Sequence, residues 1–148
     1  ISPENIVASL TSYKPTNNRS QVEKGSNNTL ILDAYNANPS SMKQAILSFR
    51  KHPGEDKMTI LGDMLELGAY EKQEHKNILD ELKIAEFGQI ILVGKAFFQW
   101  KAEYPEYHFF ENNMAALDYL KSAKPRGKVI LLKGSRGIKL ELLKETLL

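Results

Sequence analysis

Short apolar runs alternate with longer amphipathic segments along this chain of 148 residues. The apolar runs are rich in Ile, Leu and Val and stop abruptly at glycine or polar residues, which is typical of buried strands. The segments between them repeat apolar residues at helical spacing. We predict strands at residues 21–23, 29–32, 57–61, 89–93, 107–110 and 128–132, and helices at 3–11, from Pro39 to Pro53, before Gly88, at 112–124 and after Gly137.

The order of these elements predicts an α/β fold. Strands that alternate with helices of ten or more residues indicate βαβ units, and the right-handed crossover of such a unit makes its strands parallel. The glycine- and asparagine-rich turn at 25–28 instead predicts an N-terminal hairpin. We therefore expect a single Rossmann-like domain over residues 1–148, with an open, mostly parallel sheet and helices on both of its faces.

Composition narrows the classes of function. The chain is 42% hydrophobic and 26% charged, as in an ordinary globular domain, and its net charge of +2 comes from residues scattered along the whole length. Nucleic acid is therefore not an expected partner. The absence of cysteine fits a reducing compartment, and no apolar run approaches the ~18 residues that a membrane span needs. We expect a cytoplasmic protein, and the first residue, Ile1, suggests a piece of a larger parent.

Polar residues and glycines follow four of the predicted parallel strands, at residues 33–38, 62–68, 94–95 and 133–137. The carboxyl ends of parallel strands share one edge of a sheet, which is where open α/β sheets bind ligands. Glycine lets the backbone approach a ligand, and lysine and arginine supply charge for a carboxylate or phosphate. We expect a cleft for an anionic ligand at this edge.

Several of these residues also have a purely structural interpretation. Asn38, just before Pro39, is a good helix cap, and Asp63 and Glu66 suit the N-terminus of a helix. His75 begins an apolar helical face, where a buried, hydrogen-bonded histidine is common. The three histidines lack the spacing of metal ligands, and no metal site is expected in this chain.

No self-sufficient nucleotide site is visible. The stretch from Gly88 to Lys95 superficially suggests a phosphate loop, but its spacing is wrong and its middle reads as a strand. The fingerprint GxGxxG is absent as well. An ATP-dependent function would need another domain.

Three ordered motifs resemble the carboxyl-terminal domain of the Mur ligases. They are DAYNANP at 33–39, GDMLELG at 62–68 with His75 downstream, and LLKGSRG at 131–137, and Arg19 stands where the family usually has a Gly-Arg pair. The resemblance covers essentially the whole chain. It is strongest to the family member that adds D-Ala-D-Ala.

The resemblance implies an ATP-dependent amide ligase of peptidoglycan synthesis. In such an enzyme the terminal carboxylate of UDP-N-acetylmuramoyl-tripeptide is phosphorylated, and the amine of D-Ala-D-Ala then attacks it. This chain would be the third domain, closing over a central ATPase domain that binds ATP and Mg²⁺, with a further N-terminal domain for the UDP substrate. The third domain alone would be inactive.

The resemblance also implies roles for individual residues. Arg19, Asp33 and Asn36 would contact the nucleotide, and Lys133, Ser135 and Arg136 would bind the dipeptide. Asp63, Glu66 and His75 would support the reacting centre. Two alternatives stay open: a domain of another ligase of the Mur or folylpolyglutamate synthetase type, and a stand-alone Rossmann-like module that binds a small anion.

Overall fold

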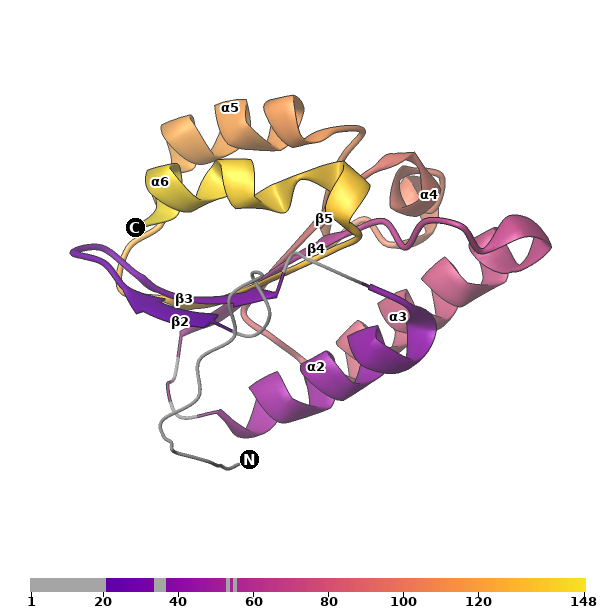
Figure 1. Cartoon of the computed structure of the whole chain (residues 1–148), viewed down its shortest axis with the longest axis horizontal. Coiled ribbons are helices and arrows are strands. Elements are labelled where there is room, and N and C mark those ends of the chain that lie inside the picture. Colours follow the sequence, from indigo (N-terminus) through magenta and orange to yellow (C-terminus); the bar gives the residue numbers. More distant parts are fainter. Residues whose placement is uncertain (1–20, 34–36, 53, 55) are drawn as a thin grey trace.

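The computed structural model describes residues 21–33, 37–52, 54 and 56–148 (Figure 1). The helix predicted at 3–11 lies outside these residues, as do Arg19 and Asn36.

Among the residues that the structure describes, the sheet has six strands in the order β2-β3-β7-β4-β5-β6. Of these six described strands, β2 alone runs antiparallel to its neighbour, so the predicted hairpin and the predicted parallel sheet are both confirmed. The strands are β2 (Gln21–Lys24), β3 (Thr29–Asp33), β4 (Lys57–Gly62), β5 (Gln89–Val93), β6 (His108–Phe110) and β7 (Val129–Lys133).

Helices cover both faces of the sheet, as predicted. Figure 1 shows α2 (Pro39–Lys51) and α3 (Glu71–Ala85) below the sheet, and α5 (Asn113–Ala123) and α6 (Lys144–Leu147) above it. The shorter helical segments are η1 (Gly68–Tyr70), α4 (Lys95–Phe98), η2 (Lys101–Glu103), η3 (Arg136–Ile138) and η4 (Leu140–Leu143).

Each face of the sheet has its own hydrophobic core. In β3 the side chains of Leu30 and Leu32 join the core under α5 and α6, whereas Ile31 packs against the core under α2 and α3. Successive side chains of a strand point to opposite faces. Because both faces are covered, the central strands are apolar at nearly every position, which explains the uninterrupted runs in the sequence.

Two helix ends differ from the prediction. Gly88 does not stop α3, because Glu86 already adopts the left-handed conformation with φ 56° and donates its N–H to the carbonyl of Leu82. The closing helix is a 3-10 segment, η4, followed by the single turn of α6. Its leucines 140, 143 and 147 are nevertheless fully buried, so the helical spacing correctly marked the buried face.

Candidate functional site

The carboxyl ends of the parallel strands meet along one edge, as predicted. Asp33 of β3 is in register with Lys133 of β7, and Gly62 of β4 with Val93 of β5. Beyond the strands, the N–H of Ser135 donates to the carbonyl of Asp63 at 3.0 Å. The loops that carry the sequence motifs are therefore neighbours in space.

Two glycines make this close approach possible. A Cβ atom added to Gly134 would lie 2.8 Å from the Cα of Gly62, and one added to Gly62 would lie 3.0 Å from Ile138. Real Cβ atoms are not found so close to a backbone atom. The glycines of GDMLELG and KGSRG thus allow their two loops to pack directly on each other.

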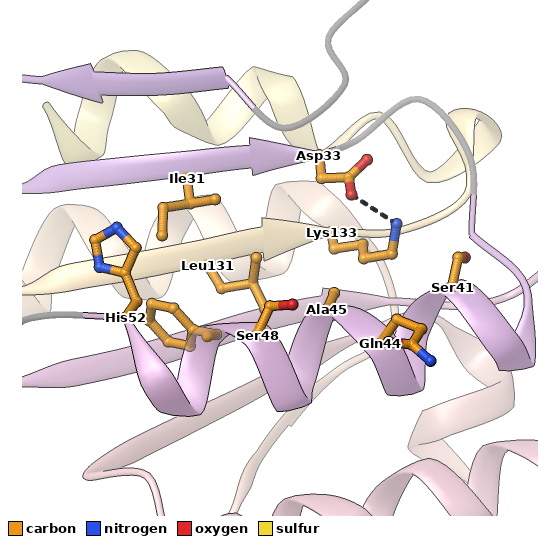
Figure 2. Close-up of a pocket in the computed structure, with 10 residues that line it drawn as sticks. Ile31, Asp33, Ser41, Gln44, Ala45, Ser48, His52, Leu131 and Lys133 are labelled. Carbon is orange, nitrogen blue, oxygen red and sulfur yellow. Dashed lines mark hydrogen bonds and ion pairs between the residues drawn. The ribbon is translucent and has the colours of Figure 1, made fainter. Parts of the chain in front are cut away.

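Asp33 and Lys133 form an ion pair in the wall of a cavity. The Lys133 ammonium donates to Oδ2 of Asp33 at 2.9 Å, and the two side chains are 3% and 18% exposed. Figure 2 shows the pair beside α2, with Ile31 and Leu131 along the sheet. The cavity has a volume of about 460 Å³ and is lined by Ile31, Asp33, Ser41, Gln44, Ala45, Ser48, Phe49, His52, Leu131 and Lys133.

Ser135 connects three of the four loops, whereas Arg136 is exposed. The Ser135 hydroxyl accepts the N–H of Leu65 at 2.8 Å and donates to the carbonyl of Ala37 at 3.4 Å. The side chain is buried, so its hydroxyl is already used within the protein. Of the three residues predicted to bind the dipeptide, Arg136 is the one on the surface.

Asp63 is buried and faces the first turn of α4. Its carboxylate accepts the N–H groups of Ala96 at 2.9 Å and Phe97 at 3.1 Å. Burial raises the pKa of Asp63, although these two hydrogen bonds act in the opposite direction. Asp63 therefore does bind the N-terminal backbone N–H groups of a helix, as that interpretation predicted. The helix is α4, however, and not the next helix in the sequence.

Gly94 leaves the space that the Asp63 carboxylate occupies. Gly94 has φ +127°, a conformation that favours glycine, and an added Cβ atom would overlap the carboxyl group of Asp63. The glycine before Lys95 therefore positions Asp63; it is not a phosphate cradle.

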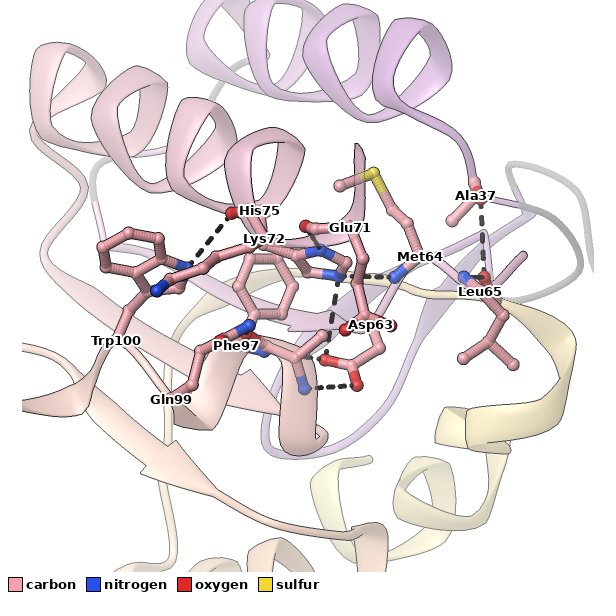
Figure 3. Close-up of polar contacts among 12 residues, drawn as sticks. Ala37, Asp63, Met64, Leu65, Glu71, Lys72, His75, Phe97, Gln99 and Trp100 are labelled. Carbon is pink, nitrogen blue, oxygen red and sulfur yellow. Dashed lines mark hydrogen bonds and ion pairs between the residues drawn. The ribbon is translucent and has the colours of Figure 1, made fainter. Parts of the chain in front are cut away.

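His75 is completely buried and both ring nitrogens are occupied (Figure 3). Nε2 accepts the N–H of Met64 at 3.0 Å, and Nδ1 lies 2.6 Å from the carbonyl of Glu71. A carbonyl can only accept, so Nδ1 carries the proton and the ring is neutral. The interpretation of His75 as a buried, hydrogen-bonded residue is confirmed, and its contacts hold the GDMLELG loop against α3.

Glu66 differs from Asp63 and His75, the other two residues predicted to support the reacting centre. Its side chain is exposed, and its backbone has φ 65°, in the left-handed region. The acids in the first turn of α3 are Glu71 and Glu74. Glu66 therefore lies on the surface of the loop and does not cap that helix.

A second cavity of about 550 Å³ opens at the same edge, and most of its side chains were not predicted as site residues. It is lined by Asp63, Leu65, Glu71, Gly94, Lys95, Ala96, Gln99, Glu111, Asn112, Asn113, Gly137 and Ile138. The polar run after β6 follows the same strand-end pattern as the four predicted loops. That pattern was the signal that could have identified Glu111.

Among the described residues, no group of three or more His, Cys, Asp or Glu side chains is arranged to hold a metal ion. None of the described helices is long and apolar enough to cross a membrane.

Comparison with known proteins identifies relatives that match most of the chain. Residues 18–136 match the family model described as Mur ligase, glutamate ligase domain. The UDP-N-acetylmuramoyl-tripeptide--D-alanyl-D-alanine ligase of Bacillus subtilis is 36% identical over 152 residues, which cover 95% of this chain and 33% of the relative.

Solved structures give the same result. MurF from Acinetobacter baumannii is 28% identical with a TM-score of 0.81, and the match covers 95% of this chain and 32% of that one. MurF ligase from Thermotoga maritima, in complex with ADP, has a TM-score of 0.74 over 96% of this chain and 33% of that one; at 22% identity it supports the fold alone. The chain thus spans about a third of the length of the relatives it matches.

Proposed function

Because this chain belongs to the Mur ligase family, we propose that it is the C-terminal domain of an ATP-dependent ligase that adds D-Ala-D-Ala to UDP-N-acetylmuramoyl-tripeptide in the cytoplasm. The name of the Bacillus subtilis relative supports this substrate. The observation that carries the proposal is the convergence of the DAYNANP, GDMLELG and KGSRG loops on one edge of the sheet. The parent would also contain an N-terminal domain for the UDP substrate and a central ATPase domain.

In the proposed reaction, the terminal carboxylate of the tripeptide attacks the γ-phosphorus of ATP, which gives an acyl phosphate and ADP. The amine of the dipeptide then attacks the acyl carbon, phosphate leaves, and the amine loses a proton. ATP and Mg²⁺ would be bound mainly by the central domain. The contribution of this chain is to orient the amine and exclude water when the domains close.

The nucleotide and the dipeptide would use different parts of the edge. Asp33, with Arg19 and Asn36, would contact the nucleotide, and Arg136 would contact the dipeptide directly. Lys133 and Ser135 would act with Arg136 mainly by fixing its loop, because the first pairs with Asp33 and the second bonds Leu65 and Ala37.

Asp63, Glu66 and His75 would support the reacting centre through the shape of the GDMLELG loop. Asp63 joins this loop to α4 and His75 joins it to α3, while Glu66 lies on its exposed surface. No proton transfer is assigned to these three residues.

The test uses the full-length parent enzyme. Arg136→Ala should lower kcat/KM for D-Ala-D-Ala about 10- to 150-fold, because a charge-assisted hydrogen bond is lost. This corresponds to a loss of roughly 1.5–3 kcal/mol of transition-state stabilisation. Arg126→Ala is the matched control, since Arg126 is an exposed arginine just before the amino end of β7. Unchanged dipeptide kinetics for Arg136→Ala would reject the assigned role.

Two further assays separate the alternatives. Residues 1–148 alone should show no ATP-dependent ligation, and turnover by this fragment would refute the division of labour between domains. Screening the parent against D-Ala-D-Ala, glutamate and single amino acids distinguishes the dipeptide ligase from other ligases of the Mur or folylpolyglutamate synthetase type. A stand-alone anion-binding module would use none of them.

A further inference from the structure

The second cavity, lined by Lys95 and the residues around it, presents charges of both signs. Lys95 is the first residue of α4, Glu71 is the first residue of α3, and Glu111 follows β6. All three side chains are exposed and line the cavity of about 550 Å³, a size that suits a small ligand.

The walls around these charges are fixed by hydrogen bonds. On one side, Asp63 holds the N–H groups of Ala96 and Phe97, directly after Lys95. On the other side, the Asn113 amide donates to the carbonyls of Ile138 and Lys139 at 3.0 and 3.3 Å. The backbone that carries Lys95 is therefore preorganised, which lowers the entropic cost of binding.

The Lys95 ammonium is available for a ligand. Within the part of the chain that the structure describes, the Lys95 side chain forms no hydrogen bond or ion pair, although its backbone carbonyl accepts the N–H of Gln99. By contrast, the Lys133 ammonium, at the same edge, donates to Asp33. An exposed ammonium on a fixed backbone at a cavity wall suits a carboxylate.

The charge pattern selects a zwitterion over a nucleotide. A polyphosphate would be repelled by the carboxylates of Glu71 and Glu111, whereas an α-amino group would be attracted by them. A short peptide carries an amine and a carboxylate about 7 Å apart when it is extended, from ~3.5 Å per residue. The cavity has room for both ends at once.

We propose that this cavity binds the incoming dipeptide, with the ammonium of Lys95 on the dipeptide carboxylate and with Glu71 and Glu111 toward its amino end. This inference rests on the proposed ligase function and deepens it. Arg136 lies next to Gly137 in the cavity wall, so two cations from different loops would serve the same substrate. Lys95 is then a substrate-binding and specificity residue.

The experiment compares two substrates in the full-length enzyme. D-Ala-D-Ala carries a carboxylate, and D-alanyl-D-alaninamide lacks it. The wild-type enzyme should have a KM at least tenfold lower for the acid than for the amide. Lys95→Met, which keeps an apolar stem, should raise the KM for the acid about tenfold and leave the KM for the amide unchanged, so that the preference for the acid is reduced.

Matched variants exclude a structural effect. Lys24→Met removes an exposed lysine of β2 near the opposite edge of the sheet, and Lys95→Arg keeps the charge; both should retain the preference for the acid. KM values for ATP and UDP-N-acetylmuramoyl-tripeptide should stay unchanged in Lys95→Met.

The outcomes separate this inference from the proposed function. If the parent ligates D-Ala-D-Ala and Lys95→Met prefers the acid as strongly as the wild type does, the binding role of Lys95 is overturned while the ligase function stands. An equal rise in KM for acid and amide would likewise overturn it. If the wild-type parent does not ligate D-Ala-D-Ala, the proposed function falls, and this assignment falls with it.

Discussion

Asp33 and Asp63 lie at the carboxyl ends of β3 and β4, two parallel strands with β7 between them, yet their carboxylates have different surroundings. Asp33 ends β3, pairs with the ammonium of Lys133 and lines the cavity beside α2. Asp63 follows β4, is almost completely buried and accepts two backbone N–H groups of α4. A cationic side chain can change partners when a ligand arrives, whereas a backbone N–H group cannot move away without opening the fold.

This difference shows that position after a strand does not by itself assign a role. The role of each aspartate depends on the residues next to its side chain. Beside Asp63, Gly94 leaves a gap that the carboxylate fills, so the side chain turns inward. Beside Asp33, the neighbour in register on the next strand is Lys133, and the resulting ion pair lines a cavity. We therefore expect changes around Asp63 to affect stability and changes at Asp33 to affect ligand use.

The strongest test of this contrast fills the gap beside Asp63. Gly94→Ala should lower the free energy of unfolding by roughly 3 kcal/mol or more, because the methyl group overlaps the carboxylate and φ is +127°. Gly127→Ala should cost only about 1 kcal/mol, since Gly127 also has positive φ but nothing lies within 4 Å of its added Cβ. Urea unfolding followed by circular dichroism measures both. Equal losses would mean that the Asp63 carboxylate is not held in this gap.

The sequence was sufficient to predict the parallel sheet, the hairpin and the edge where the motifs meet, because these depend on local patterns and on the handedness of βαβ units. It was not sufficient to separate the roles of polar residues at that edge. The bond from α4 to Asp63 joins residues more than thirty positions apart. Such a contact depends on how the loops pack, which no local pattern encodes.

The Ser135 hydroxyl illustrates the same limit. In the sequence it looks available for a ligand, but in the fold it bonds Leu65 and Ala37. The position of Asp33 and Lys133 at the same edge could be predicted, because both residues end strands of one parallel sheet. The strand order that makes them neighbours was not predicted from the sequence.

The KM for ATP should also distinguish Asp33 from Asp63. In the full-length parent, Asp33→Ala should raise the KM for ATP about tenfold, equivalent to about 1.4 kcal/mol, because a proposed nucleotide contact is lost. Asp63→Asn should leave this KM near that of the wild type and instead lower the free energy of unfolding by about 1–3 kcal/mol, since its amide leaves one backbone N–H group unsatisfied. A normal nucleotide KM for Asp33→Ala would make Asp33 a structural aspartate as well.

The smallest expected effect comes from a third aspartate, Asp80, on the exposed side of α3. The hydroxyl of Tyr104 donates to its carboxylate at 2.6 Å, and this hydrogen bond is the main reason that the pKa of Asp80 is lowered. A lowered pKa in the folded state adds stability above the unfolded pKa of about 3.9, and this stability is lost as the pH falls through the folded value. For Asp63 the direction is opposite, because burial raises its pKa and stability is lost as the pH rises.

Tyr104→Phe should therefore lower the free energy of unfolding by about 0.5 kcal/mol at pH 7, a value discounted because Asp80 is half exposed. The loss should shrink as the pH falls from about 3.9, where Asp80 becomes protonated in the unfolded chain, toward the lowered pKa that it has in the folded protein. Tyr70→Phe is the control, because Tyr70 is 73% exposed. Urea unfolding at pH 7 and pH 3 measures the difference. A loss of the same size at both values would show that the hydroxyl does not act through the charge of Asp80, and the contrast with buried Asp63 would then rest on hydrogen-bond geometry alone.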